Sequence, residues 1–179
     1  MILNNLQILC CSSLTSVTIP NSVTYLGTHT FYNCKRLTSV IIGSGVTSID
    51  YGTFWRCSNL SSVTFGNNVT SIGDNAFRDC VSLQSINIPE GVTSIRGGAF
   101  YGCKALTSLT FPNSLTSIEW GAFYDCKALT SVTIPNSVTE LGEYAFYGCY
   151  CKGTNFLANH NRMQQVELDI LMFMLLQRY

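Results

Sequence analysis

Apolar residues recur along this chain with a period of 23 residues. Each unit opens with a cysteine, and a leucine follows three positions later. The next two apolar positions alternate with polar ones, as in Val17 and Ile19, which predicts a short β-strand with one buried face. A second apolar pair and a phenylalanine complete the unit, as in Val23, Leu26 and Phe31. A fixed period of this length predicts a solenoid in which each unit forms one coil.

Turn residues divide each unit into segments. Pro-Asn-Ser follows the first predicted strand at 20–22, 112–114 and 135–137, where proline presets φ and asparagine tolerates a positive φ. The V-T-x-I pattern then predicts a second short extended segment. The x-x-A-F-x-x-C pattern is expected to form a short helical or 3₁₀ turn that returns the chain to the start of the next coil. Residues 1–150 are therefore expected to form a mostly parallel β-solenoid of about six to seven repeats.

The repeat ends after Cys149, since Lys152 stands where a leucine is due. The tail, 151–179, is expected to be a separate non-repeat segment. Residues 162–177 contain good helix formers, no glycine and no proline, which predicts a C-terminal helix. The helix is expected to cap the open end of the solenoid. A dimerisation helix and the remnant of a membrane anchor are the alternatives.

The repeat unit resembles a known type of leucine-rich repeat. CKALTSVTIPNSVTELGEYAFYGC, at 126–149, is similar to the repeat of the BspA-like surface proteins, and the resemblance covers about residues 3–149. It implies a right-handed leucine-rich-repeat solenoid. It also implies a surface-exposed or secreted protein that adheres to a host or matrix protein. The family has no common catalytic residues.

The start of the chain suggests a second interpretation. No signal peptide is visible in the first residues, MILNNLQILCCSS, which lack a basic segment. The alternative is therefore a cytoplasmic location, with the chain acting as an intracellular leucine-rich-repeat scaffold for protein–protein interaction.

The charge pattern limits the possible partners. Charged residues make up 11% of the chain, with ten basic and ten acidic residues and no basic block. Nucleic acids and anionic membranes are bound by clustered Lys and Arg, so neither is expected as a partner. The long apolar run at 170–176 is too short for a membrane-spanning helix, which needs about 20 residues. A protein ligand is expected, with the oligomeric state left open.

No catalytic, cofactor or metal motif is present in the sequence, and the two histidines, His29 and His160, have no matching partners in the sequence pattern. An enzyme is therefore not expected. The periodic cysteines could form a metal or redox array. We expect instead that they are small buried apolar residues whose thiols bond the backbone of the turns. They stand at Cys11, Cys34, Cys57, Cys80, Cys103, Cys126 and Cys149.

Ligand contacts are expected where the repeats differ. The outward strand positions form a nearly uniform hydroxyl column, which either only hydrates the sheet or also serves as an extended binding face. Ile41 and Asn87 interrupt this column, beside Ser39 and Ser85. Tyr and Trp concentrate near the return turns, where they either pack between coils or bind a partner. The candidate protein-binding residues are Ser39, Ile41, Trp55, Ser85, Asn87 and Trp120.

Overall fold

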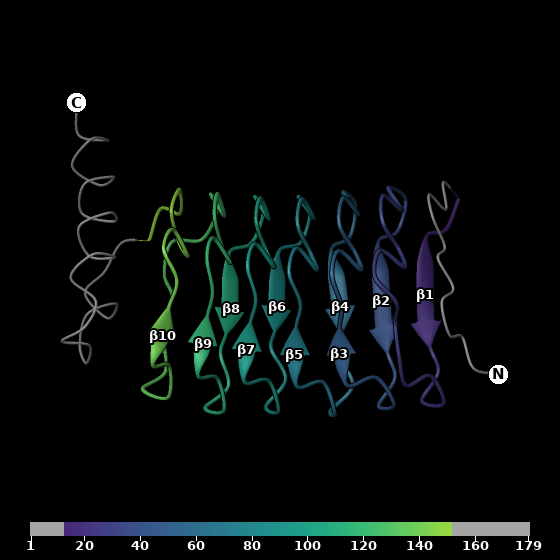
Figure 1. The fold of residues 1–179 in the computed structure, drawn as a ribbon. Helices are drawn as coiled ribbons and strands as arrows, with labels where there is room; N and C mark the ends of the chain where they lie inside the picture. The colour runs from purple at the N-terminus through teal and green to yellow at the C-terminus, as the bar shows by residue number, and fades with distance from the viewer. Residues whose placement is uncertain (1–12, 152–179) are drawn as a thin grey trace.

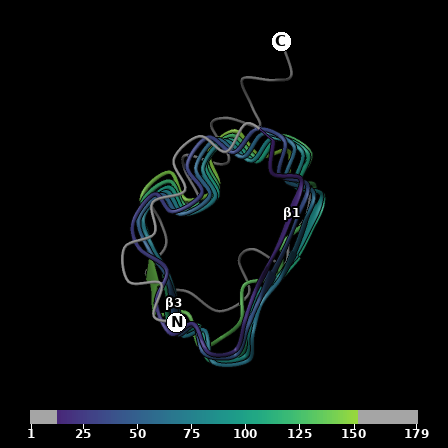
Figure 2. The ribbon, with the colours of Figure 1, turned by 90° about the vertical axis from the view of Figure 1, so that its right-hand side faces the viewer.

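The computed structural model describes residues 13–151, and these form a parallel β-solenoid (Figure 1). Viewed along the axis, the coils lie over one another, with β1 on one side and β3 on the other (Figure 2). The predicted helix at 162–177 lies outside the described residues, so the boundary between solenoid and tail stays a prediction.

Two columns of short strands follow the two extended segments of the repeat. The first column contains β1 (Ser16–Ile19), β2 (Ser39–Ile42), β4 (Ser62–Thr64), β6 (Ser85–Asn87) and β8 (Ser108–Thr110). The second contains β3 (Ser48–Ile49), β5 (Ser71–Ile72), β7 (Ser94–Ile95), β9 (Ser117–Ile118) and β10 (Glu140–Leu141). All pairs are parallel, and each residue pairs with the one 23 positions along the chain, as Ser16 does with Ser39. The predicted period and strand direction are confirmed.

The two columns differ in continuity. The second column forms one five-stranded sheet, in the order β10-β9-β7-β5-β3. The first column divides into β1-β2-β4 and β6-β8, and the equivalent segment of the last described coil, 131–133, is not a strand. The sequence pattern predicted a strand in every unit, so this part of the prediction is wrong for the last coil.

The return segments differ from the expected helical or 3₁₀ turns, because the described residues contain no helix of any type. Each return segment is instead a run of turns closed by bonds from residue i+3 to residue i, such as Tyr32 N–H to His29 O at 3.0 Å. Two residues per coil, four positions apart, have positive φ, as His29 at 58° and Asn33 at 60° do. A left-handed residue interrupts a right-handed helix.

This backbone conformation links neighbouring coils. In the first return segment the N–H groups of His29, Phe31 and Asn33 donate to carbonyls of the next coil, at 2.8 to 2.9 Å. A helix would satisfy these donors internally and leave the coils unconnected here. The return side therefore carries its own inter-coil ladder of hydrogen bonds.

The core consists of columns of identical residues. One leucine per coil is fully buried, at Leu37, Leu60, Leu83, Leu106 and Leu129. The phenylalanine rings stack in a continuous column from Phe31 to Phe146, with centroids 5.1 to 5.3 Å apart. Because each ring packs against its own copies, the repeat is also the packing unit.

The cysteine column confirms the structural interpretation of these residues. The buried thiol of Cys57 donates to the carbonyl of Phe31 in the preceding coil, at 3.0 Å. The same bond recurs from the cysteines at 80, 103, 126 and 149, at 3.2 to 3.3 Å. Among the described residues, no group of His, Cys, Asp and Glu side chains could hold a metal ion.

Candidate binding surface

The six candidate residues lie on two different sides of the coil. Ser39 and Ile41 belong to β2, and Ser85 and Asn87 belong to β6. Trp55 lies within a return turn and Trp120 lies at the start of one, in both cases after the second strand column. The structure therefore does not bring the six residues into one site.

The first-column face is polar and cross-linked. Thr38 Oγ1 donates to Thr15 O at 2.9 Å, and Thr107 Oγ1 donates to Gln84 O at 3.1 Å. Asn87, singled out because it breaks the Thr column, accepts a 2.7 Å bond from Thr110 Oγ1 of the next coil. Ile41 is half-exposed and is the one large apolar side chain exposed on the described first-column strands. Many of the hydroxyls around this face thus form hydrogen bonds that join neighbouring coils.

The return turns carry a column of rings and one guanidinium, which we call the aromatic column. Its members stand at the same position of successive coils: Tyr32, Trp55, Arg78, Tyr101, Tyr124 and Tyr147. Tyr101 and Tyr124 stack at 4.7 Å, and Tyr124 and Tyr147 at 5.0 Å. Burial within this stack raises the pKa of Tyr124, and the neighbouring tyrosines act in the same direction.

Arg78 completes the aromatic column where a ring is missing. Its Cζ lies 4.3 Å from the ring centroid of Tyr101 and 5.4 Å from that of Trp55, which is cation–π geometry. Nη1 also donates to Asn75 Oδ1 at 3.2 Å. Sequence reasoning noted the aromatic residues but missed Arg78, although its place in the 23-residue register marks it.

Replacing Arg78 with alanine is expected to lower the free energy of unfolding by about 1 kcal/mol, because Trp55 and Tyr101 both lose the guanidinium. Arg78→Tyr is the matched variant, since tyrosines stack at the equivalent positions of the next coils. Urea unfolding should show that tyrosine restores most of the lost stability. Equal losses in the two variants would show that the column is not held by ring contacts.

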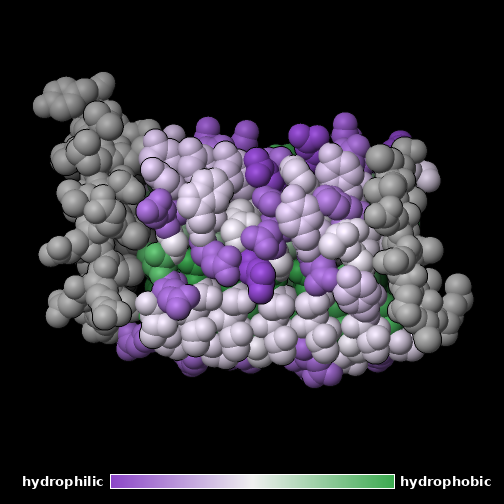
Figure 3. All heavy atoms as spheres, in the orientation of Figure 1, coloured by the Kyte–Doolittle hydropathy of each residue, from purple (hydrophilic) through white to green (hydrophobic). Residues whose placement is uncertain are grey.

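Exposed aromatic side chains gather along the border between the second strand column and the return turns, which we call the aromatic border. Trp120 is 51% exposed, and Tyr25, Tyr51 and Tyr144 are 41 to 42% exposed. They form two groups. Near the N-terminal end, His29 lies 5.0 Å from Tyr51, between ring centroids. Near the C-terminal end, Trp120 lies 6.4 Å from Tyr144. Figure 3 shows pale rings among hydrophilic side chains across the upper part of this face.

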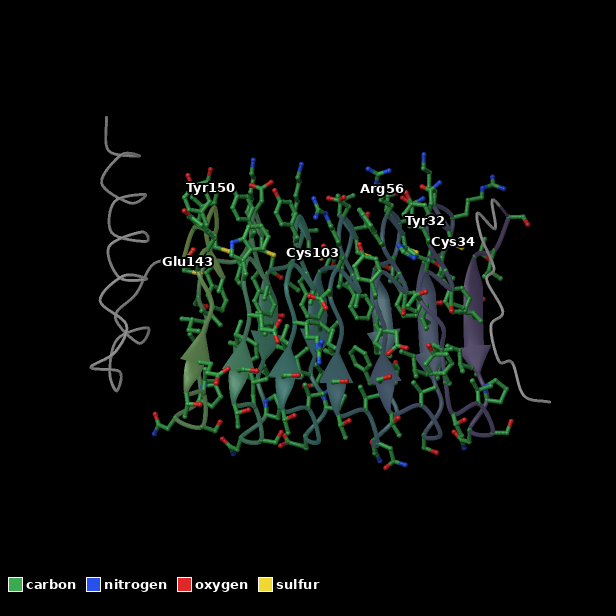
Figure 4. The ribbon with its side chains drawn as sticks, viewed as in Figure 1. Tyr32, Cys34, Arg56, Cys103, Glu143 and Tyr150 are labelled. Carbon is green, nitrogen blue, oxygen red and sulfur yellow. The ribbon has the colours of Figure 1, made fainter. Side chains whose placement is uncertain are left out.

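The two sides of the return turn differ in their charged residues. The border next to the second strand column carries Asp50, Asp74, Glu119 and Glu143, with Arg96 as its basic residue. The side that leads to the first strand column carries both signs, with Lys35, Arg36, Arg56, Lys104 and Lys127 beside Asp79 and Asp125. In Figure 4, Tyr32 and Arg56 lie together on the return-turn side, and Glu143 extends from the last described coil.

The carboxylate of Asp50 affects the ionisation of one tyrosine of the border. A hydrogen bond between Tyr25 and Asp50, together with the negative charge of Asp50, raises the pKa of Tyr25. The exposed rings and carboxylates of this border are accessible for contact with another molecule.

Within residues 13–151 no helix is long and apolar enough to span a membrane.

Comparisons with known proteins agree with the repeat architecture. A family model described as the BspA type leucine-rich repeat region matches six copies, over residues 9–107 and 94–167. No curated protein matches the sequence.

Solved structures of bacterial leucine-rich repeat proteins have the same fold. A leucine-rich cell surface protein from Faecalibacterium prausnitzii is 39% identical, with a TM-score of 0.67, over 79% of this chain and 38% of that protein. A protein from Bacteroides ovatus is 30% identical, with a TM-score of 0.70, over 79% and 43%. One from T. pallidum is 30% identical, with a TM-score of 0.63, over 76% and 62%. This chain spans less than two thirds of each of these proteins.

Proposed function

Because this chain belongs to the BspA-type leucine-rich repeat family, we propose that it is a non-enzymatic adhesion module that binds a host or matrix protein. The similarity to a cell surface protein of Faecalibacterium prausnitzii supports a location at the cell surface. Solenoids offer extended surfaces on which side chains of successive repeats act together.

The observation that carries this proposal is the row of exposed aromatic residues on the border beside the second strand column. Trp120, Tyr51 and Tyr144 are each 41 to 51% exposed. Tyr and Trp are the residues that most often dominate binding energy at protein interfaces. The backbone beneath them is held by inter-coil bonds, such as Gly121 N–H to Glu143 O at 3.0 Å. Rings on such a rigid support lose little conformational freedom on binding.

The proposal places recognition on the aromatic border, which includes Trp120, and on the aromatic column of the return turns, which includes Trp55. Ser39, Ile41, Ser85 and Asn87 stay a proposed second face on the first strand column. A protein ligand that contacts both would have to wrap around the solenoid, since the two strand columns lie on opposite sides (Figure 2).

We expect the purified chain to bind immobilised matrix protein or intact host cells saturably, and to lose binding when the target is first treated with protease. The double variant Tyr51→Ala/Trp120→Ala should bind at least about 10-fold more weakly, since each residue is a potential hot spot. Asn67→Ala is the control, because Asn67 is exposed in the turn between the two strand columns. Equal binding by both variants would exclude the aromatic border, and the absence of saturable, protease-sensitive binding would overturn the function itself.

A further inference from the structure

Aromatic rings and carboxylates share one patch at the C-terminal end of the described solenoid. We call it the acidic-aromatic patch, and it consists of Glu119, Trp120, Glu140, Glu143 and Tyr144. Glu119 and Trp120 follow β9, and the other three lie in or directly after β10. Because β9 and β10 are paired in register, Glu143 occupies the position of Trp120 one coil further along the axis. Neighbouring parallel strands lie about 4.8 Å apart, so these backbones are adjacent.

Glycines allow the two backbones to lie close together and leave no side chain at the position equivalent to Trp120 in the preceding coil. A Cβ at Gly142 would lie only 2.4 Å from the backbone nitrogen of Trp120, so the close approach of these coils requires glycine. On the other side of Trp120, the equivalent position of the preceding coil is Gly97, which has no side chain. Trp120 is therefore flanked by a glycine on one side and a carboxylate on the other.

The rings of the patch are open to a ligand. Trp120 and Tyr144 are 51% and 41% exposed. Their rings are 6.4 Å apart at an interplanar angle of 78°, an edge-to-face pair. In an edge-to-face pair, one of the two rings points its edge at the other. The two faces of that ring are therefore not covered by its partner. A flat or cationic group can stack on that free face.

The carboxylates of the patch make no close ion pair with any residue that the structure describes. Within residues 13–151, the side chains of Glu119, Glu140 and Glu143 make no ion pair and no hydrogen bond. The aspartates elsewhere on the return side differ: Asp74 lies 4.0 Å from Arg96, and Asp125 lies 3.3 Å from Lys127. Arg96 stands at the position of Glu119 one coil earlier, but it lies within ion-pair distance of Asp74 and not of Glu119. Among residues 13–151, the patch therefore combines two exposed rings with three carboxylates that make no ion pair.

A positively charged side chain fits this combination, because ring faces attract cations and carboxylates bind guanidinium groups. The protein already shows this chemistry at Arg78, whose guanidinium lies over Tyr101 and is 3.9 Å from Asp79. A neutral sugar could stack on the rings and donate hydroxyl hydrogen bonds to the carboxylates, but it carries no positive charge to balance theirs, and an anionic ligand would be repelled. Arginine also stacks on rings better than lysine does.

We propose that the acidic-aromatic patch binds an arginine-rich segment of the partner protein. The proposal rests on the proposed function and names the chemistry of the partner. It predicts that binding weakens as the salt concentration rises, because the interacting charges are solvent-exposed.

The test uses the full chain with Trp55→Phe, which leaves Trp120 as its single tryptophan. Hexa-arginine is expected to change the fluorescence of Trp120 saturably, whereas hexaglutamate and maltohexaose are not. By calorimetry, Glu119→Gln/Glu143→Gln and Trp120→Ala should each raise the Kd for hexa-arginine by about 10-fold. Glu90→Gln is the matched control and should bind as tightly as the parent, because Glu90 lies in an exposed turn between the strand columns.

Three results would overturn the assignment. They are an unchanged Kd in the glutamine double variant, an equal loss in Glu90→Gln, and binding of maltohexaose in place of hexa-arginine. Adhesion measured on the same variants separates the two proposals. If matrix binding persists in the glutamine double variant, the patch assignment fails and the adhesion function stands. If hexa-arginine binds as expected and no matrix or host protein is bound, the adhesion function fails.

Discussion

Replacing Phe100 with alanine is expected to lower the free energy of unfolding by about 3–5 kcal/mol. Phe100 is completely buried, and its ring stacks between Phe77 at 5.2 Å and Phe123 at 5.1 Å. Its loss leaves a cavity in the middle of the column. The backbones of the neighbouring rings are held by inter-coil bonds, Phe77 N–H to Ala99 O and Phe123 N–H to Ala145 O, both at 2.7 Å, so these rings cannot move to fill it. Urea unfolding followed by circular dichroism measures the change.

A half-buried ring in the following coil, Tyr124, provides the control for this prediction. Tyr124→Ala also removes a stacked ring, at 4.7 Å from Tyr101, but that ring is partly exposed. Its loss should cost roughly 1 kcal/mol, since less apolar surface returns to water. A loss below about 1 kcal/mol for Phe100→Ala would mean that the coils are not coupled through the phenylalanine column.

Stability is expected to fall steeply above about pH 9, because the buried thiols keep their protons in the folded state. Desolvation raises the pKa of Cys57 to about 12, with the neighbouring Cys34 adding to the effect. Burial raises the pKa of Cys80 and Cys103 well above the usual range. An unfolded cysteine titrates near about 8.5, so above that pH the unfolded chain loses protons that the folded chain retains.

The sign and size of this effect follow from proton linkage. The stabilisation is fully present below the unfolded pKa and is lost as the pH rises toward the folded pKa. Each thiol contributes about 1.4 kcal/mol per pH unit, so the three thiols together cost roughly 4 kcal/mol between pH 9 and 10. The urea midpoint measured across this range should therefore fall sharply.

A variant with one thiol fewer separates this effect from the titration of other groups. Cys103→Ala should reduce the pH dependence by about 1.4 kcal/mol per pH unit, because one of the shifted thiols is gone. The same slope in the variant and the parent chain would show that these thiols do not cause the alkaline unfolding.

The candidate surface was only partly predictable from the sequence. Variation between repeats identified Trp120, which lies on the aromatic border, and Trp55, which belongs to the aromatic column of the return turns. It also identified Asn87, whose side chain is bonded to Thr110 of the next coil. Variation marks a position that differs from its copies, and a difference that serves packing looks the same in sequence as one that serves binding. Exposure, as at Glu143, and the absence of an ion pair within residues 13–151, as at Glu119 and Glu143, can be seen only in three dimensions.

The return turns were likewise only partly predictable from the sequence. Gly, Asn or Asp occupies most of their left-handed positions, a signal that sequence reasoning did not use. His29, Arg56 and Tyr144 adopt the same conformation without that signal. The inter-coil hydrogen bonds at these positions involve residues 22 positions apart, and their formation depends on the stacking of coils.

The sequence by itself determined the period, the parallel register and the buried columns, including Leu106, Phe100 and Cys103. A solenoid gives every coil the same interior environment, so each interior position selects the same residue type again and again. The tertiary structure alone decided the inter-coil hydrogen bonds of the return turns, the break between β4 and β6, and the exposure of each candidate side chain. These features depend on contacts between neighbouring coils and on solvent exposure, which the order of residues within one repeat does not specify.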